Sequence, residues 1–387
     1  MVLRVSVGII GAYSLKYESR SQLEAWDMIR ESIKGVLNSV DKGIDPRDIE
    51  LVIVSNFSDG YGNLLHSGPL AVDYLGNPSA KAFRVENACV SGSTALYIAY
   101  NFLKAGLARN ALIVGFEKMS TQPSGSAANE ILAKAAHPLE IVAGASFAGL
   151  YALIAKAYMD KYGLKEEDMA LVAVKNHENA VRNPLAQFRR KITIEEVLSS
   201  QYVAWPLKLM DSSPLTDGAA ALIVSAEPKM YTDTPAYIKG ISMAHDKPGV
   251  FQREDMAMLR AIKEAADNAY RQAGVTARNI NVFEVHDAFT IAEIVIYEML
   301  GLAERGKGAS LLKERTVWFD GSHPVNVSGG LKAKGHPIGA TGVGMLAEVF
   351  WQVRGEAGER QVKDAEIGLV ENHGGTGATV VVTILSR

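Results

Sequence analysis

A short pattern of residues occurs twice in the chain, and this repeat constrains the fold more than any other feature of the sequence. Residues 89–94 have the form C-x-x-G-x-T, and residues 336–341 have the form H-x-x-G-x-T. A helical stretch and then an apolar strand follow each pattern. Residues 43–55 and 274–286 form a second matching pair, each with a glycine stop, a polar turn and a buried strand. Two matches in the same order indicate a duplication.

Helical and strand patterns alternate in both halves, which predicts an α/β fold with mixed, largely parallel sheets covered by helices. The chain has 387 residues, enough for two to three domains at roughly 150 residues each. A polar stretch with two prolines at 227–235 is the expected boundary, so we predict an N-terminal domain at 1–235 and a C-terminal domain at 236–387. A long loop insertion of about 118–210 interrupts the first half, as a lid or binding region would.

The charge and apolar content of the chain exclude some classes of partner. The net charge is only -3, so no strong basic field is present to hold nucleic acid or an anionic membrane. The apolar runs are far shorter than the ~20 residues of a membrane helix. Because Cys89 is the single cysteine, no intrachain disulfide can form, and we expect a reducing, cytoplasmic location.

Cys89 is a candidate nucleophile for acyl transfer. It lies just before a helix that is rich in small residues, and a helix N-terminus favours the reactive thiolate. A lone cysteine can equally be a small buried hydrophobe. The repeat places His336 at the corresponding point of the second half. If the halves pack about a pseudo-twofold axis, the two helix N-termini converge and bring His336 close to Cys89.

Three of the eight histidines lie at strand ends or glycine-rich turns of the second half: His286, His336 and His373. Ligands bind at such positions in open α/β sheets. The turn after His373 frees backbone N–H groups that can face an oxyanion. Asp287 and Glu371 can either orient these histidines or form turns. We interpret the other five histidines as structural or surface residues: His66, His137, His177, His245 and His323.

Other kinds of site have weaker support. No Walker A motif is present, and the glycines near residues 8–11 and 339–344 make only incomplete dinucleotide motifs. The histidines lack the i, i+4 spacing of helical metal ligands, so we predict no metal site. The basic residues Arg189, Arg190 and Lys191 can contact a nucleotide phosphate or form a solvated loop.

Several longer motifs resemble those of the thiolase superfamily. Residues 88–92 resemble its nucleophile segment, and residues 335–342 resemble its G-H-P-x-G-x-[ST]-G box. The H-D-A-F sequence at 286–289 is similar to the H-D-C-F box of sterol-carrier-protein-type members. Residues 175–184 and 217–221 also resemble that subgroup, so the resemblance covers essentially the whole chain. The usual second cysteine of a C-x-G motif is replaced by His373, as in archaeal thiolases.

The resemblance implies duplicated βαβαβαββ halves in a layered α-β-α-β-α sandwich. It implies an acetyl-CoA C-acetyltransferase that converts two acetyl-CoA to acetoacetyl-CoA and CoA. It also implies a homodimer or homotetramer that uses acyl-CoA substrates and needs no resident cofactor. Archaeal thiolases work beside hydroxymethylglutaryl-CoA synthase in mevalonate formation, so a complex with that enzyme is a further expectation.

The resemblance assigns a role to each candidate catalytic residue. Cys89 takes the acyl group, and His336 accepts its proton and later donates a hydrogen bond to the thioester oxygen of the second substrate. His286 is the other donor to that oxygen. His373 removes the Cα proton, since histidine titrates near neutrality. The backbone N–H groups of Cys89 and Gly375 hold the tetrahedral oxyanion.

Two alternative functions are considered. One is a decarboxylating synthase, because a Cys–His–His set is similar to that of ketoacyl synthases. The H-D-A-F and G-H-P boxes argue against it. The other is a catalytically idle acyl-CoA-binding scaffold, against which the four intact catalytic candidates argue.

Overall fold

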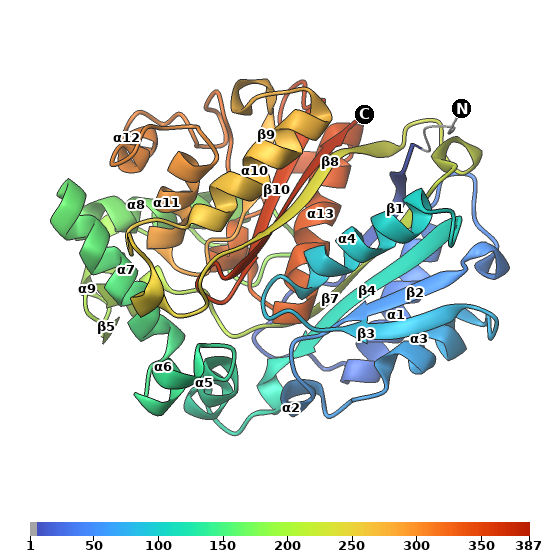
Figure 1. Cartoon of the computed structure of the whole chain (residues 1–387), viewed down its shortest axis with the longest axis horizontal. Helices are drawn as coiled ribbons and strands as arrows, with labels where there is room; N and C mark the ends of the chain where they lie inside the picture. The colour runs from blue at the N-terminus through green and yellow to red at the C-terminus, as the bar shows by residue number, and fades with distance from the viewer. Residues whose placement is uncertain (1–5) are drawn as a thin grey trace.

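Strands and helices alternate along both halves of the computed structural model, which describes residues 6–387 (Figure 1). The strands are β1 (Gly8–Ser14), β2 (Leu51–Ser55), β3 (Lys81–Val85), β4 (Asn110–Lys118), β5 (Tyr202–Ala204), β6 (Leu207–Lys208), β7 (Asp217–Ser225), β8 (Ala236–His245), β9 (Val282–Val285), β10 (Ile367–Gly374) and β11 (Thr379–Ser386). The α-helices are α1 (Ala25–Asn38), α2 (Asp59–Gly62), α3 (Ser67–Leu75), α4 (Ser91–Lys104), α5 (Gly125–Ala133), α6 (Pro138–Val142), α7 (Phe147–Tyr162), α8 (Glu166–Ala180), α9 (Ile194–Ser199), α10 (Arg260–Ala273), α11 (Thr290–Met299), α12 (Gly308–Lys313) and α13 (Ile338–Arg354).

The main sheet has nine strands in the order β3-β2-β4-β7-β1-β8-β11-β10-β9. Its two halves, β3 to β1 and β8 to β9, join where Gly8 pairs with Tyr237 and Ile9 with Ala236. The strands are parallel where β2 meets β3 and β4 and where β9 meets β10, and antiparallel at the other pairings of this sheet. The expectation of a largely parallel sheet is therefore wrong. The last strand of each half is β7 or β11. Each lies inside the sheet and is antiparallel to both of its neighbours.

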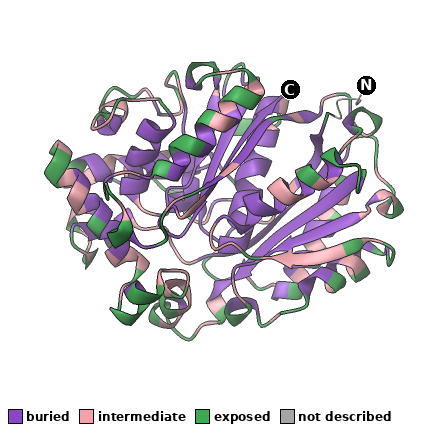
Figure 2. Ribbon diagram, in the orientation of Figure 1, coloured by how far each residue is buried: buried purple, intermediate pink, exposed green. Residues whose placement is uncertain are grey.

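Three apolar clusters separate five layers. The first lies between α1 and α3 and the outer face of β2, β4 and β7. The second contains α4 and α13 and the inner faces of both strand groups. The third lies between β8, β10 and β11 and the helices α7, α10 and α11. Most strands of the main sheet and most of α13 are buried, whereas the edge strand β3 is half-buried and helices such as α1 and α10 each expose one face (Figure 2). This arrangement confirms the α-β-α-β-α order, with both β-layers belonging to one continuous sheet.

The helices α4 and α13 pack closely at their N-terminal ends, because glycines leave room there. A Cβ atom on Gly92 would lie 2.6 Å from the backbone nitrogen of Val343. A Cβ atom on Gly342 would lie 2.5 Å from the backbone nitrogen of Ser93. The two helix N-termini therefore converge as the repeat predicts, and α13 lies between the two groups of strands (Figure 1).

The two halves differ in detail. In the first half the elements run β1-α1-β2-α3-β3-α4-β4-β7, the full βαβαβαββ order. In the described part of the second half, an isolated bridge between Phe283 and Val325 stands in the place of the third strand. The segment expected to be a loop insertion at 118–210 holds α5 to α9 and the small sheet of β5 and β6. It is largely helical because its apolar residues, as in α7, pack onto the second half of the core.

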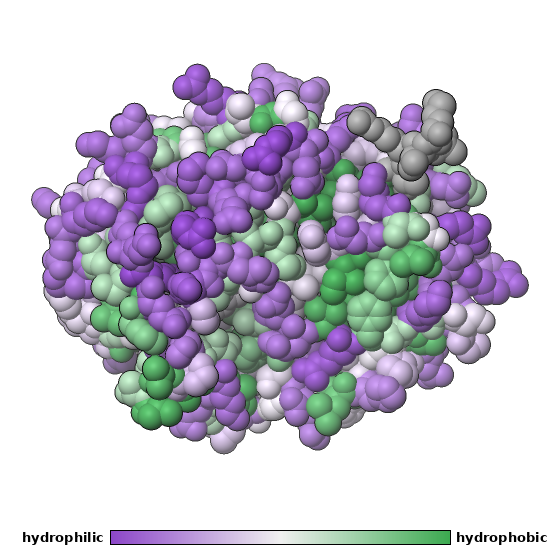
Figure 3. All heavy atoms as spheres, in the orientation of Figure 1, coloured by the Kyte–Doolittle hydropathy of each residue, from purple (hydrophilic) through white to green (hydrophobic). Residues whose placement is uncertain are grey.

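The predicted domain boundary lies in the connection between β7 and β8, where a short 3-10 turn at Pro228–Met230 is the only helical element described. Within residues 6–387, every helix is too short or too polar to cross a membrane. Polar side chains cover most of the face shown in Figure 3, and apolar side chains gather on it in small patches.

Candidate active site

Cys89 lies just before α4, and the residue that precedes it has an unusual backbone conformation. Ala88 has a φ of 49°, in the left-handed region that side-chain-bearing residues rarely adopt. Hydrogen bonds hold this turn: the Ser91 hydroxyl donates to the carbonyl oxygen of Ala88 (2.6 Å) and accepts from the backbone N–H of Asn87 (2.8 Å). The turn presents the thiol at the convergence of the two helices, and positive φ at such a position is typical of functional sites.

Burial raises the pKa of the Cys89 thiol to about 12, while hydrogen bonds from the backbone N–H groups of Gly375 and Cys89 lower it in part. Burial of the charged form therefore opposes the thiolate that the helix N-terminus favours. The two N–H groups are the predicted oxyanion donors, and both face the sulfur. The nucleophile needs a base that takes its proton during attack.

His336 is placed to be that base. Its Nδ1 lies 2.7 Å from the hydroxyl oxygen of Thr341, which donates its own hydrogen to the carbonyl of Pro337 (3.0 Å). The Thr341 oxygen therefore accepts a hydrogen from Nδ1 of His336, so Nε2 carries a free lone pair. Burial, with a smaller effect of His373, lowers the pKa of His336 to about 3, which keeps the ring neutral.

His286, just after β9, has the opposite tautomer. The side-chain amide of Asn372 donates to Nδ1 of His286 (2.9 Å) and to the carbonyl oxygen of Cys89 (3.2 Å). The hydrogen of the neutral ring then lies on Nε2, which is buried and has no hydrogen-bond partner among residues 6–387. Burial, His373 and His336 lower the pKa of His286 well below its ordinary value. A buried donor without a partner is suited to a substrate oxygen.

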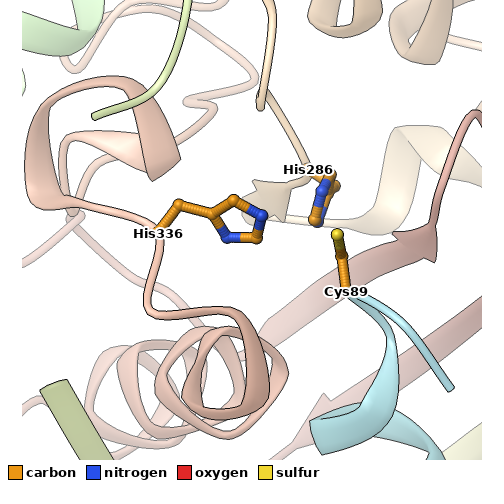
Figure 4. A group of neighbouring side chains, drawn as sticks. All are labelled: Cys89, His286 and His336. Atoms are coloured by element: carbon orange, nitrogen blue, oxygen red, sulfur yellow. The ribbon is translucent and has the colours of Figure 1, made fainter. Parts of the chain in front are cut away.

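Cys89, His286 and His336 point toward one another from α4, the end of β9 and the start of α13 (Figure 4). The sulfur and one nitrogen of each ring lie within 4.8 Å of one another. Such a set has the composition of a metal site. However, Nε2 of His286 bears hydrogen in the arrangement above, and a ligating nitrogen must give that hydrogen up. The hydrogen bonds favour proton transfer over metal binding, and the absence of a metal stays a prediction.

His373, near the end of β10, packs against His286 with their ring centroids 4.3 Å apart. Its Nδ1 donates to a carboxylate oxygen of Glu371 at 2.9 Å, and its Nε2 lies 2.7 Å from the hydroxyl of Tyr151. The other carboxylate oxygen of Glu371 accepts the backbone N–H of His286 (3.1 Å). Of the two alternatives for Glu371, the structure favours the orienting role.

Comparisons with known proteins identify the family of this chain. The N-terminal domain model of thiolase matches residues 7–228, and the thiolase C-terminal domain-like model matches residues 242–387. The chain belongs to the thiolase family. It is 40% identical over 384 residues to an acetyl-CoA acetyltransferase of Methanothermobacter thermautotrophicus, covering 98% of this chain and 99% of that protein.

Two further relatives have the same fold. Human sterol carrier protein 2 is 36% identical over 331 residues, covering 80% of this chain and 59% of that protein. A solved structure described as an Ltp2-ChsH2(DUF35) aldolase superposes with a TM-score of 0.85 and 22% identity, covering 100% of this chain and 99% of that one. Together with the family models, the Methanothermobacter relative shows a thiolase-type acyltransferase.

The basic residues of the insertion do not contact the catalytic residues of this thiolase. Arg190 pairs with Glu196 at 3.0 Å, and Lys191 pairs with Glu178 at 3.4 Å. Arg189 donates to the carbonyl of Val181 at 3.2 Å. All three side chains are exposed, so their predicted contact with a CoA phosphate stays a prediction.

Two cavities meet beside the nucleophile. The larger, about 660 Å³, has Arg84, Glu86 and Lys134 among its lining residues. The smaller, about 110 Å³, is lined in part by Phe147 and Gly375. Asn87 and Ala88 line both cavities, so both reach the backbone just before the nucleophile.

The sequence motifs did not identify three groups that contact the catalytic residues: Tyr151, Asn372 and Thr341. Asn372 lies between two residues that were singled out, and Thr341 closes the H-x-x-G-x-T pattern, so their positions carried a signal. Tyr151 lies on α7 within the insertion and belongs to no motif. Asp287 contacts none of the histidine rings; it accepts backbone N–H groups of Leu331 and Lys332 in the π-helix Gly330–Lys334.

Proposed function

We propose that this thiolase catalyses the reversible condensation of two acetyl-CoA to acetoacetyl-CoA and CoA through an acetyl group carried on Cys89. The observation that supports this most is the pairing of the partly buried thiol with two backbone N–H donors and a free lone pair on His336. This pairing fits acyl transfer to sulfur. The name of the Methanothermobacter relative supports acetyl-CoA as the substrate.

In the first step the Cys89 sulfur attacks the thioester carbon of acetyl-CoA while its proton moves to Nε2 of His336. The oxyanion that forms is held by the N–H groups of Cys89 and Gly375, and losing one such donor typically costs about a hundredfold in rate. The CoA sulfur then leaves with the proton of His336. Because burial raises the pKa of the Cys89 thiol, a base that takes its proton assists the attack.

In the second step an enolate of another acetyl-CoA attacks the acetyl group on Cys89. The N–H at Nε2 of His286 donates to the thioester oxygen, where negative charge develops. His336 donates a second hydrogen bond only while its own Nε2 holds a proton. His373, with Glu371 behind it, receives the Cα proton. Histidine is suited to this task because it titrates near neutral pH.

The proposal extends to the setting of the reaction. Acetoacetyl-CoA from this chain would supply mevalonate formation in the cytoplasm, with hydroxymethylglutaryl-CoA synthase as the next enzyme and a homodimer or homotetramer as the working form. Analytical ultracentrifugation of the chain alone and mixed with that synthase tests both assemblies. A monomer, or two species that sediment independently, would count against them.

Thiolysis of acetoacetyl-CoA by free CoA tests the central reaction. We expect consumption by the intact protein and none above background with Cys89→Ala. His245→Ala, an exposed histidine on β8, is the matched control and should keep full activity. Because the chain has one cysteine, an acetyl group that is detected by mass analysis after incubation with acetyl-CoA and is released by neutral hydroxylamine reports a thioester on Cys89. No consumption by the intact protein, with turnover of malonyl thioesters and carbon dioxide release instead, would contradict the proposal.

A further inference from the structure

Neither ring nitrogen of His373 is free to reach a substrate carbon. Nδ1 faces a carboxylate oxygen of Glu371 at 2.9 Å, and Nε2 faces the hydroxyl of Tyr151 at 2.7 Å. Both His373 and Tyr151 are buried, with exposed fractions of 0% and 1%. A Cα proton that ends on His373 must therefore pass through the Tyr151 hydroxyl, or Tyr151 must leave its place.

The Tyr151 ring is held in place. Its ring stacks on Phe289 with a centroid distance of 4.6 Å and an interplanar angle of 27°, and its helix α7 packs in the core of the second half. Displacing it would break this stacking and both hydrogen bonds of its hydroxyl. Because the surroundings of Tyr151 are tightly packed, a side chain that stays in place fits the structure better than one that moves away.

The hydroxyl of Tyr151 has two acceptors within reach. Besides Nε2 of His373, it lies 3.0 Å from the carbonyl oxygen of Gly375. When His373 is neutral, the hydroxyl donates to Nε2. When His373 is protonated, Nε2–H donates to the tyrosine oxygen, and the hydroxyl donates to Gly375. Nε2 of His373 and the tyrosine hydroxyl therefore keep a hydrogen bond to each other in both protonation states, as a proton relay requires.

Gly375 also places this hydroxyl beside the nucleophile. The backbone N–H of Gly375 faces the Cys89 sulfur, and its carbonyl faces Tyr151. A negative charge on Cys89 raises the pKa of Tyr151, in addition to the larger effect of burial. Gly375 therefore links the tyrosine hydroxyl to the nucleophile that carries the acetyl group, and both lie on the same side of the site as His373.

From this geometry we propose that Tyr151 is a catalytic residue whose hydroxyl carries the proton between the Cα of acetyl-CoA and His373. This inference rests on the proposed condensation. The Cα–H bond breaks and its proton moves to the tyrosine oxygen, while the tyrosine O–H proton moves to Nε2 of His373. The electron pair stays on the substrate as an enolate. It forms the new carbon–carbon bond as the bond from the acetyl carbon to the Cys89 sulfur breaks. The proton on His373 then returns through Tyr151 to the departing thiolate.

Tyr151→Phe removes the hydroxyl and keeps the stacked ring. We expect condensation and thiolysis to slow by about a hundredfold, within the range for loss of a proton-transfer group, while acetylation of Cys89 from acetyl-CoA stays within about threefold. The control is Tyr158→Phe on the same helix, equally buried, whose hydroxyl contacts Glu298 away from the site. It should condense within about threefold of the intact protein.

Isotope effects on the intact protein test the relay without relying on the folding of a variant. Condensation of unlabelled and methyl-deuterated acetyl-CoA is compared in H₂O and D₂O, in single turnovers of pre-acetylated protein. The relay moves a carbon-bound and an oxygen-bound hydrogen in one step, so both labels should slow that step. Direct transfer to His373 would give the substrate effect alone.

The results separate the two hypotheses. Condensation by Tyr151→Phe within about threefold of the intact protein, or a substrate isotope effect without a solvent effect, would overturn the role of Tyr151. Slow acetylation of Cys89 in Tyr151→Phe would also overturn it, because the hydroxyl would then act in the first step. An intact protein that neither acetylates Cys89 nor thiolyses acetoacetyl-CoA would overturn the proposed function instead.

Discussion

The corresponding helix N-termini of the two halves have the same geometry and opposite chemistry. Each C/H-x-x-G-x-T pattern lies at the start of a central helix, and Gly92 and Gly342 let the helices meet. In the first half this position holds Cys89, whose thiol gives up its proton in the proposed attack. In the second it holds His336, whose Nε2 is a proton acceptor. The comparison teaches that one duplicated scaffold can supply both partners of a proton transfer.

The strands that follow these helices extend the comparison. Each strand carries a buried glutamate in its second half: Glu117 on β4 and Glu371 on β10. Each glutamate accepts a hydrogen bond from a backbone N–H in the segment that follows a neighbouring strand. Glu117 accepts from Phe57 at 2.8 Å, and Glu371 accepts from His286 at 3.1 Å. Glu117 also accepts from Gly339 at 2.9 Å and so ties the two halves together. Only Glu371 contacts a histidine ring, that of His373.

The largest effect should come from replacing His336, the proton acceptor, by a residue that cannot accept a proton. In His336→Asn we expect acetylation of Cys89 to slow by about a thousandfold, because the thiol has no base during attack. In His286→Asn the side chain still offers an N–H, so acetylation should stay within about tenfold of the intact rate, while condensation slows by about a hundredfold. Rapid-quench mass analysis of the acetylated protein measures the first step. Equal slowing of acetylation in both variants would show that the two tautomers are assigned wrongly.

An intermediate effect should come from separating the two helix N-termini. A methyl group at Gly92 would meet the backbone of Val343, which cannot give way as a flexible side chain can. We expect Gly92→Ala to lower the free energy of unfolding by about 2 kcal/mol and to slow acyl transfer as Cys89 moves from His336. Gly106→Ala, with a φ of +70° and open space around it, is the control for backbone strain alone and should cost about 1 kcal/mol. Urea unfolding and thiolysis measure both. If Gly92→Ala were as stable as Gly106→Ala, the close approach would not be a constraint.

The fold could be predicted where its signals are local. The glycine spacing and the helix starts of the repeat identified both halves and the meeting of α4 with α13. The strand directions could not be read in this way, because the central places of β7 and β11 depend on how hairpins pair across the sheet. The helices of the insertion were also not predicted. The polar residues at both ends of 118–210 suggested a loop, although the helix α7 between them is apolar.

The candidate site was predictable for residues that lie at strand ends or helix starts. Cys89, His286 and His336 converge in the structure and His373 packs on His286, although their roles stay predictions. The raised pKa of Cys89 was not predictable, because the sequence shows a helix N-terminus and does not show the burial of the thiol. Tyr151 was not predictable because only the docking of α7 brings it to the site.

The smallest expected effect is on the pH dependence of stability and comes from Glu117. It tests whether Glu117 differs from Glu371 in its role. Burial raises the pKa of Glu117 to about 8, although hydrogen bonds from Phe57 and Gly339 lower it in part. The folded state therefore keeps a proton that the unfolded state loses near its ordinary pKa of about 4.5. The stabilisation is complete below that value and is lost as the pH rises through about 8.

Glutamine mimics the protonated carboxyl, so Glu117→Gln should remove this loss of stability with rising pH. It should also keep thiolysis within about threefold, whereas Glu371→Gln should slow it by about tenfold, because Nδ1 of His373 loses its charged acceptor. Urea midpoints at about pH 6 and about pH 9 give the first comparison, and thiolysis rates give the second. If both variants lost activity equally, Glu117 would belong to the catalytic machinery, and the two halves would be more alike than the contacts of their glutamates indicate.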